Sequence, residues 1–471
     1  MKANGAVMLF ILVAIMTACG GGSSITNPTN PPLPMPQGSA LGSLTLHDMP
    51  PVGVTVLSFH ATITGMSLQP GGVSILDSPM TLEMTQLQGT SAYMGTVSVP
   101  AGAYNGMTIT LSNPVMTFLN NTGGMMGGGG MMGEAGCAKD QICQINPTMM
   151  ALSISITGPP FPINLQANTS FNLQMDFDLM DSMQSNMSVN PMMSSMMQES
   201  PLGSDVFDDM DDMIGQVSAV NSGSNQLTMS FVQGMPSMTI TADANTSFEG
   251  FDGIGKPNSF AGLAQGQIVL ARVQLLAGGS LHAKKIRFET SNPQVLDGMI
   301  VAVNNSTQFD MVITNEAPAF ASMNVGSLLR VNVQAGSVFD MDDVDMPVSG
   351  MRFTSPSDLM VCQVVQIEPT SELVNGTPPE LNTNHVRLMK TWMTAKVASK
   401  IDPNTFSVNS LPGMFGNVGI ATIKISGSAQ TSFENVSGIS ALNAGDTVSV
   451  RGPMFLTTGM PTLIASKIQK R

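Results

Sequence analysis

The chain is poor in aromatic and in charged residues. Its 471 residues include one Trp, two Tyr, four His and four Cys, and only 11% are Asp, Glu, Lys or Arg. The formal net charge is -14. Nucleic-acid binding needs clustered Lys and Arg with aromatic stacking platforms, so no nucleic-acid partner is expected. The acidic balance also argues against a polybasic patch for a membrane surface.

Common catalytic motifs are missing as well. The sequence has no H-E-x-x-H, C-x-x-C or G-x-S-x-G. Residues 128–133 match G-x-G-x-x-G literally, but they lie in a glycine-rich run without the strand and helix of a dinucleotide site. His47 precedes Asp48 with no evident nucleophile nearby, and a turn or capping role suits it better. We therefore expect no enzyme, no catalytic residue and no cofactor.

Residues 1–18 are typical of an export signal. Lys2 precedes an apolar run of about a dozen residues, which is too short to span a membrane. The run ends at Cys19, and a proline-rich stretch completes residues 19–40, which we interpret as a tether. This start resembles a bacterial lipoprotein signal, which implies that Cys19 carries the lipid and attaches the protein to a membrane.

That resemblance also bears on location. Met16 stands where such signals usually have Leu, and Gly20 follows the cysteine instead of the Asp that retains lipoproteins at the inner membrane. The expected location is the bacterial cell envelope, at the outer membrane, on its periplasmic or surface face. No later segment approaches 18 uninterrupted apolar residues.

Strict alternation of apolar and polar residues begins near Leu41. In residues 171–179, Phe, Leu, Met, Phe and Leu alternate with Asn, Gln, Asp and Asp. Alternation of this kind places one side of a strand in a core and the other in water. Residues 41–180 therefore predict an antiparallel β-sandwich, with a Gly/Met-rich insert at 120–147 that we interpret as a long loop. No stretch shows a convincing helical period.

The same region resembles a known family. Three pieces carry the likeness: Gly-Ser-Leu-Thr-Leu-His-Asp-Met-Pro at 42–50, Ile-Thr-Gly-Met-Ser-Leu at 63–68 and Val-Pro-Ala-Gly-Ala-Tyr at 99–104. They resemble the N-terminal module of exported bacterial lipoproteins, domain of unknown function 4382. The resemblance implies a prealbumin-type β-sandwich and no established activity. After it, residues 181–205 break all periodicity and predict a Met-rich linker, and residues 205–213 predict one or two helical turns.

The rest of the chain repeats itself. The repeats are predicted at 206–290, 291–390 and 391–471, and the second is degenerate. Their anchor phenylalanines Phe248, Phe339 and Phe433 recur in Thr-Ser-Phe-Glu, Ser-Val-Phe-Asp and Thr-Ser-Phe-Glu. A period this long predicts a small all-β domain instead of a solenoid turn.

The first and third repeats resemble domain of unknown function 5666. That resemblance implies small, nearly closed, OB-like barrels, which leave few exposed strand edges. Gly266 and Gly445 suit a turn with positive φ, and we place Met360 at that position in the second repeat. The predicted fold class is therefore all-β, an N-terminal sandwich followed by three small barrels. OB-like barrels often bind sugars across one face, which makes a glycan or an envelope protein the expected partner.

Cysteine and methionine supply the remaining candidate sites. Cys137 and Cys143 lie six apart in an exported chain and predict a disulfide, with a redox pair as the alternative; Cys362 reads as a buried core thiol. Thioethers are soft ligands for Cu(I) or Ag(I) and can also be oxidised reversibly. The candidate set is Met183, Met187, Met192, Met193, Met196 and Met197.

Other interpretations of the methionine clusters and of the acidic runs stay open. The methionine clusters can also reflect composition alone, or partner docking. The acidic runs at 205–212 and 340–345 predict either a calcium loop without an EF-hand pattern or, preferably, solvated loops. Our main hypothesis is a non-enzymatic, lipid-anchored envelope protein that displays β-modules for structural or ligand interaction. The alternative hypothesis is capture of a soft metal or an oxidant, and a third is an enzyme whose site is assembled across domains.

Overall fold

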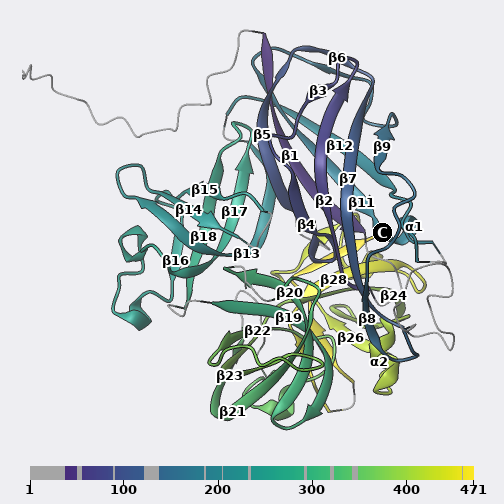
Figure 1. The fold of residues 1–471 in the computed structure, drawn as a ribbon, viewed down its shortest axis with the longest axis vertical. Coiled ribbons are helices and arrows are strands. Elements are labelled where there is room, and N and C mark those ends of the chain that lie inside the picture. Colours follow the sequence, from purple (N-terminus) through teal and green to yellow (C-terminus); the bar gives the residue numbers. More distant parts are fainter. Residues whose placement is uncertain are drawn as a thin grey trace, which may run out of the picture. The chain divides into compact units, whose positions relative to one another are not determined.

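The protein was analysed as a computed structural model. It describes residues 38–471, apart from 50–55, 88–90, 121–136, 185–186, 204, 232–234, 291–293, 319–322, 342–347, 349 and 459. Strands dominate, and the described α-helices are short: α1 (Leu179–Ser182) and α2 (Gly413–Asn417). The predicted all-β class is therefore confirmed (Figure 1). Among the described residues, no helix has the length and apolarity to cross a membrane. The predicted signal, Cys19 and nearly all of the tether lie outside this part of the chain.

The first module is a sandwich of two sheets. One sheet has the order β12-β11-β1-β5, with β1 parallel to β11; the other has the order β3-β2-β7-β8, with β4 on β2 and β9 on β7. The bounds are β1 (Ser39–Met49), β2 (Val56–Gln69), β3 (Val73–Ser74), β4 (Met80–Glu83), β5 (Ala92–Pro100), β7 (Gly106–Leu119), β8 (Ile142–Ile145), β9 (Ser153–Ile156), β11 (Thr169–Asp178) and β12 (Met193–Pro201). A short pair, β6 (Gly102–Tyr104) and β10 (Ile163–Leu165), completes it.

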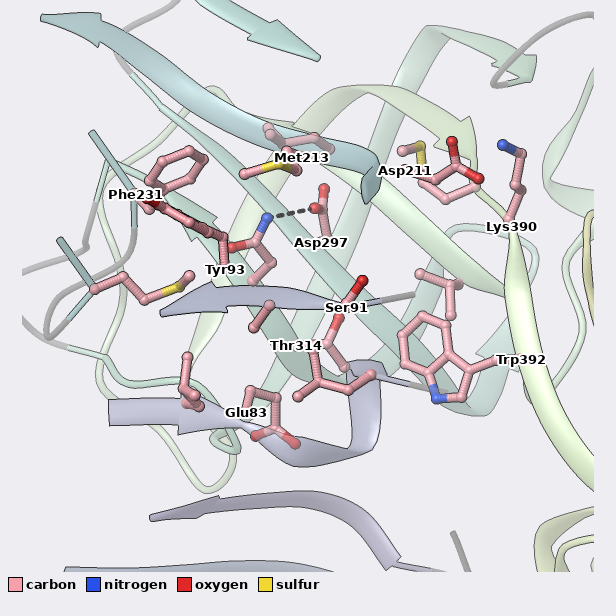
Figure 2. A pocket seen from close by; sticks show the side chains of 18 of the residues that line it. Glu83, Ser91, Tyr93, Asp211, Met213, Phe231, Asp297, Thr314, Lys390 and Trp392 are labelled. Atoms are coloured by element: carbon pink, nitrogen blue, oxygen red, sulfur yellow. Dashed lines mark hydrogen bonds between the residues drawn. The ribbon is translucent and has the colours of Figure 1, made fainter. Parts of the chain in front are cut away.

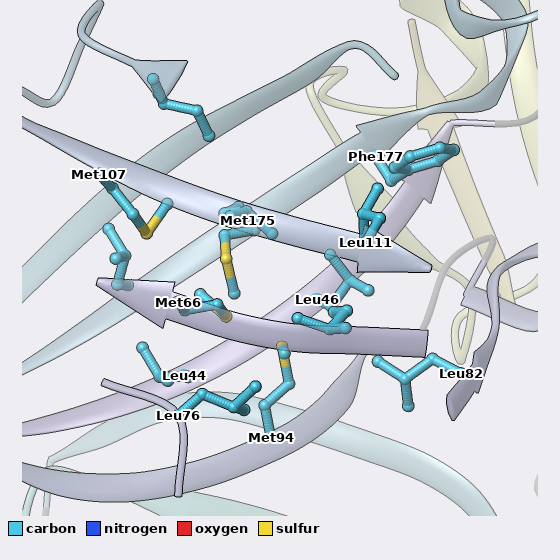
Figure 3. Close-up of a cluster of buried hydrophobic side chains, with 14 of the residues drawn as sticks. Leu44, Leu46, Met66, Leu76, Leu82, Met94, Met107, Leu111, Met175 and Phe177 are labelled. Carbon is cyan, nitrogen blue, oxygen red and sulfur yellow. The ribbon is translucent and has the colours of Figure 1, made fainter. Parts of the chain in front are cut away.

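The alternating side chains of these strands form the sandwich core. Phe59 of β2 and Phe177 of β11 are both fully buried, and their rings stack at 5.7 Å across the two sheets. Met107 and Met175 are also fully buried among leucines of both sheets (Figure 3). These methionines therefore fill core space.

Two predictions about irregular segments are wrong. Residues 181–205 are not a linker, because β12 pairs with β11 along its length, from Thr169↔Pro201 to Phe177↔Met193. The strand was hidden because it is a sheet edge, where serines and exposed residues blur the alternation. The insert at 120–147 also ends in regular structure, since β8 pairs with β7. Its residues 121–136 lie outside the described part of the chain.

A disulfide joins Cys137 to Cys143 at the start of β8. Replacing both cysteines with serine is expected to lower the free energy of unfolding by about 2 kcal/mol, because the link closes a short loop in the unfolded chain. Urea unfolding of the parent and the double variant measures this loss. Peptide mapping without reductant should show the two cysteines linked and Cys362, which is buried, as a free thiol. A parent that unfolds no later than the double variant would contradict the prediction.

The first repeat is a five-stranded barrel with one added strand. Its ring runs β13-β14-β15-β18-β17, and β16 pairs with β18. In sequence order this is 1-2-3-5-4, with the third and fifth strands parallel. The bounds are β13 (Val206–Asn221), β14 (Gln226–Ser230), β15 (Met238–Thr241), β16 (Ser247–Glu249), β17 (Ile268–Leu276) and β18 (Leu281–Thr290). The helical turns predicted for 205–213 are wrong, because β13 pairs with β17 there.

The second repeat closes in the same order despite its divergent sequence. Its ring is β19-β20-β21-β23-β22, and β21 and β23 are parallel (Figure 1). The bounds are β19 (Val295–Asn305), β20 (Gln308–Ala317), β21 (Leu328–Met341), β22 (Val364–Pro369) and β23 (Glu380–Leu388). The long strand β21 pairs with both β20 and β23, so it serves as one continuous counterpart of β15 and β16.

The third repeat is an eight-stranded sheet in the order β27-β31-β28-β24-β25-β26-β30-β29. Its bounds are β24 (Thr391–Asp402), β25 (Thr405–Asn409), β26 (Ile423–Ser426), β27 (Ser432–Glu434), β28 (Thr447–Gly452), β29 (Met454–Phe455), β30 (Thr462–Ile464) and β31 (Lys467–Lys470). Pro453 separates β28 from β29, and Ala465 and Ser466 separate β30 from β31. We count β28 with β29, and β30 with β31, as one broken strand each. The order is then β24, β25, β26, β30/β31 and β28/β29, which returns to β24 as the rings of the other repeats return to their first strand.

Internal register confirms that the three repeats are equivalent. The anchor phenylalanines all lie beside an aliphatic residue of the last strand, in the pairs Phe248↔Ile286, Phe339↔Val386 and Phe433↔Ile468. The prediction of the positive-φ turn was wrong in the second repeat. Cys362, not Met360, stands where Gly266 and Gly445 stand: φ is 65° at Cys362 and 88° and 89° at the glycines. Each of the three donates its N–H to the first strand of its barrel.

Candidate functional site

A pocket of about 150 Å³ is lined by residues of the sandwich and of all three repeats. Its aromatic side chains are Tyr93 of β5, Phe231 after β14 and Trp392 of β24 (Figure 2). The chain has a single Trp and two Tyr, so the pocket takes half or more of each scarce type. Leucine, methionine, isoleucine and valine side chains fill much of the remaining wall.

The sandwich supplies a carboxylate whose oxygens are already bound. Glu83 of β4 accepts hydrogen bonds from the Ser58 hydroxyl at 2.5 Å, the Phe59 amide at 2.9 Å and the Thr85 hydroxyl at 2.5 Å. These contacts hold Glu83 in one orientation at the pocket. Tyr93 lines the same pocket with its hydroxyl 2.7 Å from Oγ1 of Thr96, and burial raises the pKa of this phenol. Tyr93 is therefore a neutral side chain at ordinary pH.

The repeats supply polar groups around the aromatic side chains. Asp297 of β19 accepts from the Asn315 amide at 3.0 Å and from the Gln366 amide at 3.1 Å. Trp392 lies directly opposite Arg451 in the antiparallel pair β24 and β28, so both side chains are on the same face. Lys390 and Asp211 also line the pocket. Figure 2 shows carboxylates, an ammonium group and aromatic rings around one space.

The arrangement suits one ring-shaped ligand with an apolar face and polar substituents. A cavity of about 150 Å³ holds a single six-membered ring. Aromatic side chains offer flat apolar faces, and fixed carboxylates and amides orient hydroxyl groups. These are the contacts that a sugar ring makes with a protein. The charge signs are mixed, which does not favour a strongly charged ligand.

In the described part of the chain, His47 is paired with a carboxylate of the first repeat. Its Nε2 lies 3.5 Å from Oδ2 of Asp208, and the Ser91 hydroxyl donates to that same oxygen at 2.6 Å. A nucleophilic triad places the imidazole between hydroxyl and carboxylate, whereas here the carboxylate is in the middle. Burial raises the pKa of Asp208, but the contacts with His47 and Ser91 outweigh it and lower that pKa. The side chain of the neighbouring Asp48 lies outside the described set.

The first acidic run does not gather into a calcium loop. Asp208 meets His47, Asp209 lies 3.6 Å from Lys284, and Asp211 lies 4.0 Å from Arg272. Strand β13 thus distributes its carboxylates to separate partners. Within the described ranges, no three His, Cys, Asp or Glu side chains form a metal-binding group. Most of the second run, residues 342–345, lies outside those ranges.

The six candidate methionines do not converge on one point. Four of them, Met183, Met187, Met193 and Met197, pack partly buried against the sandwich core, whereas Met192 and Met196 are exposed. Met193 and Met197 are four residues apart on β12, which separates them by about 13 Å. Met196 points to the opposite side of that strand. Soft-metal capture stays a prediction that this geometry does not favour.

Sequence reasoning missed the pocket itself. Tyr93, Asp297, Trp392 and Arg451 come from three different modules and share no motif. The only signal in the sequence was the scarcity of Trp and Tyr, which marks the few aromatic residues of that kind as worth testing. The Cys362 prediction stands, since this thiol is buried and burial raises its pKa well above the ordinary value.

Comparison with protein families identifies two module types. Residues 43–192 match the model described as domain of unknown function (DUF4382). Residues 214–287 and 395–469 each match domain of unknown function (DUF5666). One DUF4382 match is thus followed by two DUF5666 matches, in the order that the sequence predicted. The second repeat has the same strand order as its neighbours but lies outside these matches. No curated protein matches the chain.

Proposed function

We propose that the protein is a lipid-anchored binding protein of the bacterial cell envelope, and that its pocket holds one sugar ring of an envelope glycan. The observation that carries the proposal is the concentration of Tyr93 and Trp392 beside fixed polar groups in a one-ring cavity. A glycan is favoured over a protein partner because the cavity is too small for a folded surface. The start of the chain supports attachment through Cys19 and an outer-membrane location.

The proposed action is binding without turnover. The pocket carboxylate Glu83 accepts hydrogen bonds from Ser58, Phe59 and Thr85, and Asp297 accepts from two amides. Groups engaged in this way orient a ligand, whereas general acid–base catalysis needs a carboxyl group poised to exchange a proton. A bound glycan should therefore be recovered chemically unchanged after incubation with the protein.

Trp392 offers a direct test, because it is the only tryptophan of the chain and lines the pocket. Titration with a neutral hexose, an N-acetylhexosamine and a hexuronic acid is expected to give a saturable change in tryptophan emission with at least one probe. Trp392→Phe should weaken binding of that probe in calorimetry by about tenfold, as loss of a stacking contact does.

Two variants separate the pocket from the rest of the surface. Asp297→Asn changes a pocket carboxylate, and Asp209→Asn changes an exposed carboxylate of β13 that pairs with Lys284. The first should weaken binding and the second should not. A natively folded protein whose emission responds to none of the three probes would refute the proposed glycan site.

A further inference from the structure

All three repeats place a cation and a carboxylate at the same point of the barrel. The carboxylate directly follows the anchor phenylalanine, and the cation is on the last strand, one position before its aliphatic partner. The ion pairs are Lys285–Glu249 at 2.6 Å, His385–Asp340 at 3.1 Å and Lys467–Glu434 at 2.9 Å. The second repeat alone uses an imidazole, the cation that ordinarily titrates near neutral pH.

His385 also belongs to a ring of contacts that joins the second repeat to the first. Its Nδ1 lies 2.8 Å from Oε1 of Glu368, and the other oxygen of Glu368 accepts from Thr290 at 3.1 Å. In the other direction, Asp340 is held by both Arg387 Nε and Nη2, at 3.0 and 3.2 Å. Arg387 Nη1 then pairs with Glu289. Because Glu289 and Thr290 are adjacent on β18, the contacts close into a ring.

Among the ion pairs of this ring, three carboxylates meet three cations when the imidazole is protonated. The carboxylates are Glu289, Asp340 and Glu368; the cations are Arg387, Arg287, which lies 2.7 Å from Glu289, and His385. Among the described residues, the charged groups that act on His385 are Asp340 on β21, Glu368 on β22 and Arg387 on its own strand. When His385 loses its proton, the carboxylates of Asp340 and Glu368 face a neutral imidazole.

The environment holds that proton firmly. Asp340, and then Glu368, raise the pKa of His385 to about 9. Burial alone raises the pKa of Asp340, but His385 and Arg387 outweigh it and lower that pKa to about 2. The side chain of Glu289 is completely buried and pairs with Arg287 and Arg387. Arg387 and Glu289 form the buried part of the ring, whereas the side chain of Asp340 is 39% exposed to solvent.

We propose that this ionic ring is a pH-dependent latch between the first and second repeats, closed while the His385 imidazole carries a proton and loosened in alkaline medium. The sign follows from linkage. The pKa of His385 is higher in the folded protein than its ordinary 6.5, so its contribution is complete below pH 6.5 and is lost as pH rises through 9. The contribution of Asp340 is complete above pH 3.8 and is lost as pH falls through 2.

Hydrogen exchange of the intact protein tests the latch. After correction for the intrinsic exchange rate, the opening equilibrium of peptides from β18, β22 and β23 is expected to rise about 10- to 100-fold between pH 6.5 and 9.5. The pKa shift of His385 sets a larger upper limit for this rise, but the side chain is partly exposed and solvent weakens its contacts. Peptides from β24 and β28 of the third repeat provide the internal reference.

Three variants isolate the imidazole. His385→Lys restores the cation of the other repeats and is expected to remove the pH response while keeping the latch closed. His385→Gln should open the latch already at pH 6.5, again with no response to pH. His282→Gln is the matched control, because His282 faces Asp243 at 3.8 Å in the first repeat, outside the ring, and it should leave the response intact.

The proposal fails if the parent shows no pH response in these peptides, or if His385→Lys responds as strongly as the parent does. Should the lysine variant not fold, the imidazole protons of His385 can be followed by NMR in the parent, assigned by comparison with the His47, His60 and His282 variants. An imidazole of His385 that titrates below pH 7 would overturn the latch, and one that titrates well above pH 8 would support it.

Discussion

Replacing Arg387 with methionine is expected to lower the free energy of unfolding by about 3–5 kcal/mol, the cost of removing one partner from a buried ion pair. Arg387 holds Asp340 through two hydrogen bonds and also pairs with Glu289, whose side chain has no exposed surface. Methionine fills similar space but removes one of the two arginines that pair with Glu289. Urea unfolding followed by circular dichroism measures the loss.

Two further variants show whether the loss comes from the uncompensated charge. Adding Glu289→Gln to the Arg387→Met variant should recover part of the stability, because an amide is less costly to bury without an arginine. Arg352→Met is the exposed counterpart: Arg352 is 69% exposed and lies 3.8 Å from Asp358. Its loss should cost less than about 1 kcal/mol. Equal losses for the two arginines would contradict the charge argument.

Period-two patterning was sufficient to predict the strands that bury one face. The alternation in 171–179 became β11, and the recurrence of Phe248, Phe339 and Phe433 predicted three equivalent barrels. Internal repetition acted as a second observation of the same fold, which is why the degenerate repeat could still be assigned. These features depend on local sequence, so a single chain reveals them.

The errors concern positions where local sequence does not decide the structure. Edge strand β12 carries methionine and serine on both faces, so its pairing depends on β11 and not on its own pattern. Strand β13 begins with an acidic run that satisfies its charges on other elements, which no helical or strand period could show. Cys362 was not recognised as the turn residue of the second repeat because a non-glycine residue at positive φ is uncommon.

The candidate site was less predictable than the fold. Tyr93 and Trp392 are 299 positions apart in the chain and come from different modules, so only their scarcity singled them out. The ionic ring is similar: each ion pair of the repeats could be found by comparing Lys285, His385 and Lys467, but not the contacts of Glu289 and Thr290 with the next module. Contacts between modules depend on surfaces that carry no periodic signal.

Gly452→Ala is expected to destabilise the third repeat by about 3 kcal/mol or more, because overpacking against backbone cannot be relieved by a rotamer change. Gly452 is the last residue of β28 and is followed by Pro453, which separates β28 from β29. It lies beside the break between β30 and β31, because its neighbours Arg451 and Pro453 accept from the backbone amides of Ser466 and Ile464. A Cβ at this position would lie 1.9 Å from the carbonyl oxygen of Ile464 and 2.8 Å from its carbon. The bend that closes the third ring therefore requires a glycine.

Gly65→Ala is the matched control. Gly65 also lies within a strand, β2, but a Cβ there would meet no heavy atom within 4 Å. That change should leave stability within about 1 kcal/mol of the parent or raise it, because alanine restricts the unfolded chain more than glycine does. Trp392 reports on the third repeat, since it lies opposite Arg451, the residue before Gly452. If the tryptophan emission of Gly452→Ala changes at the parent's urea concentration, the third ring does not close by the close approach of Gly452 to Ile464.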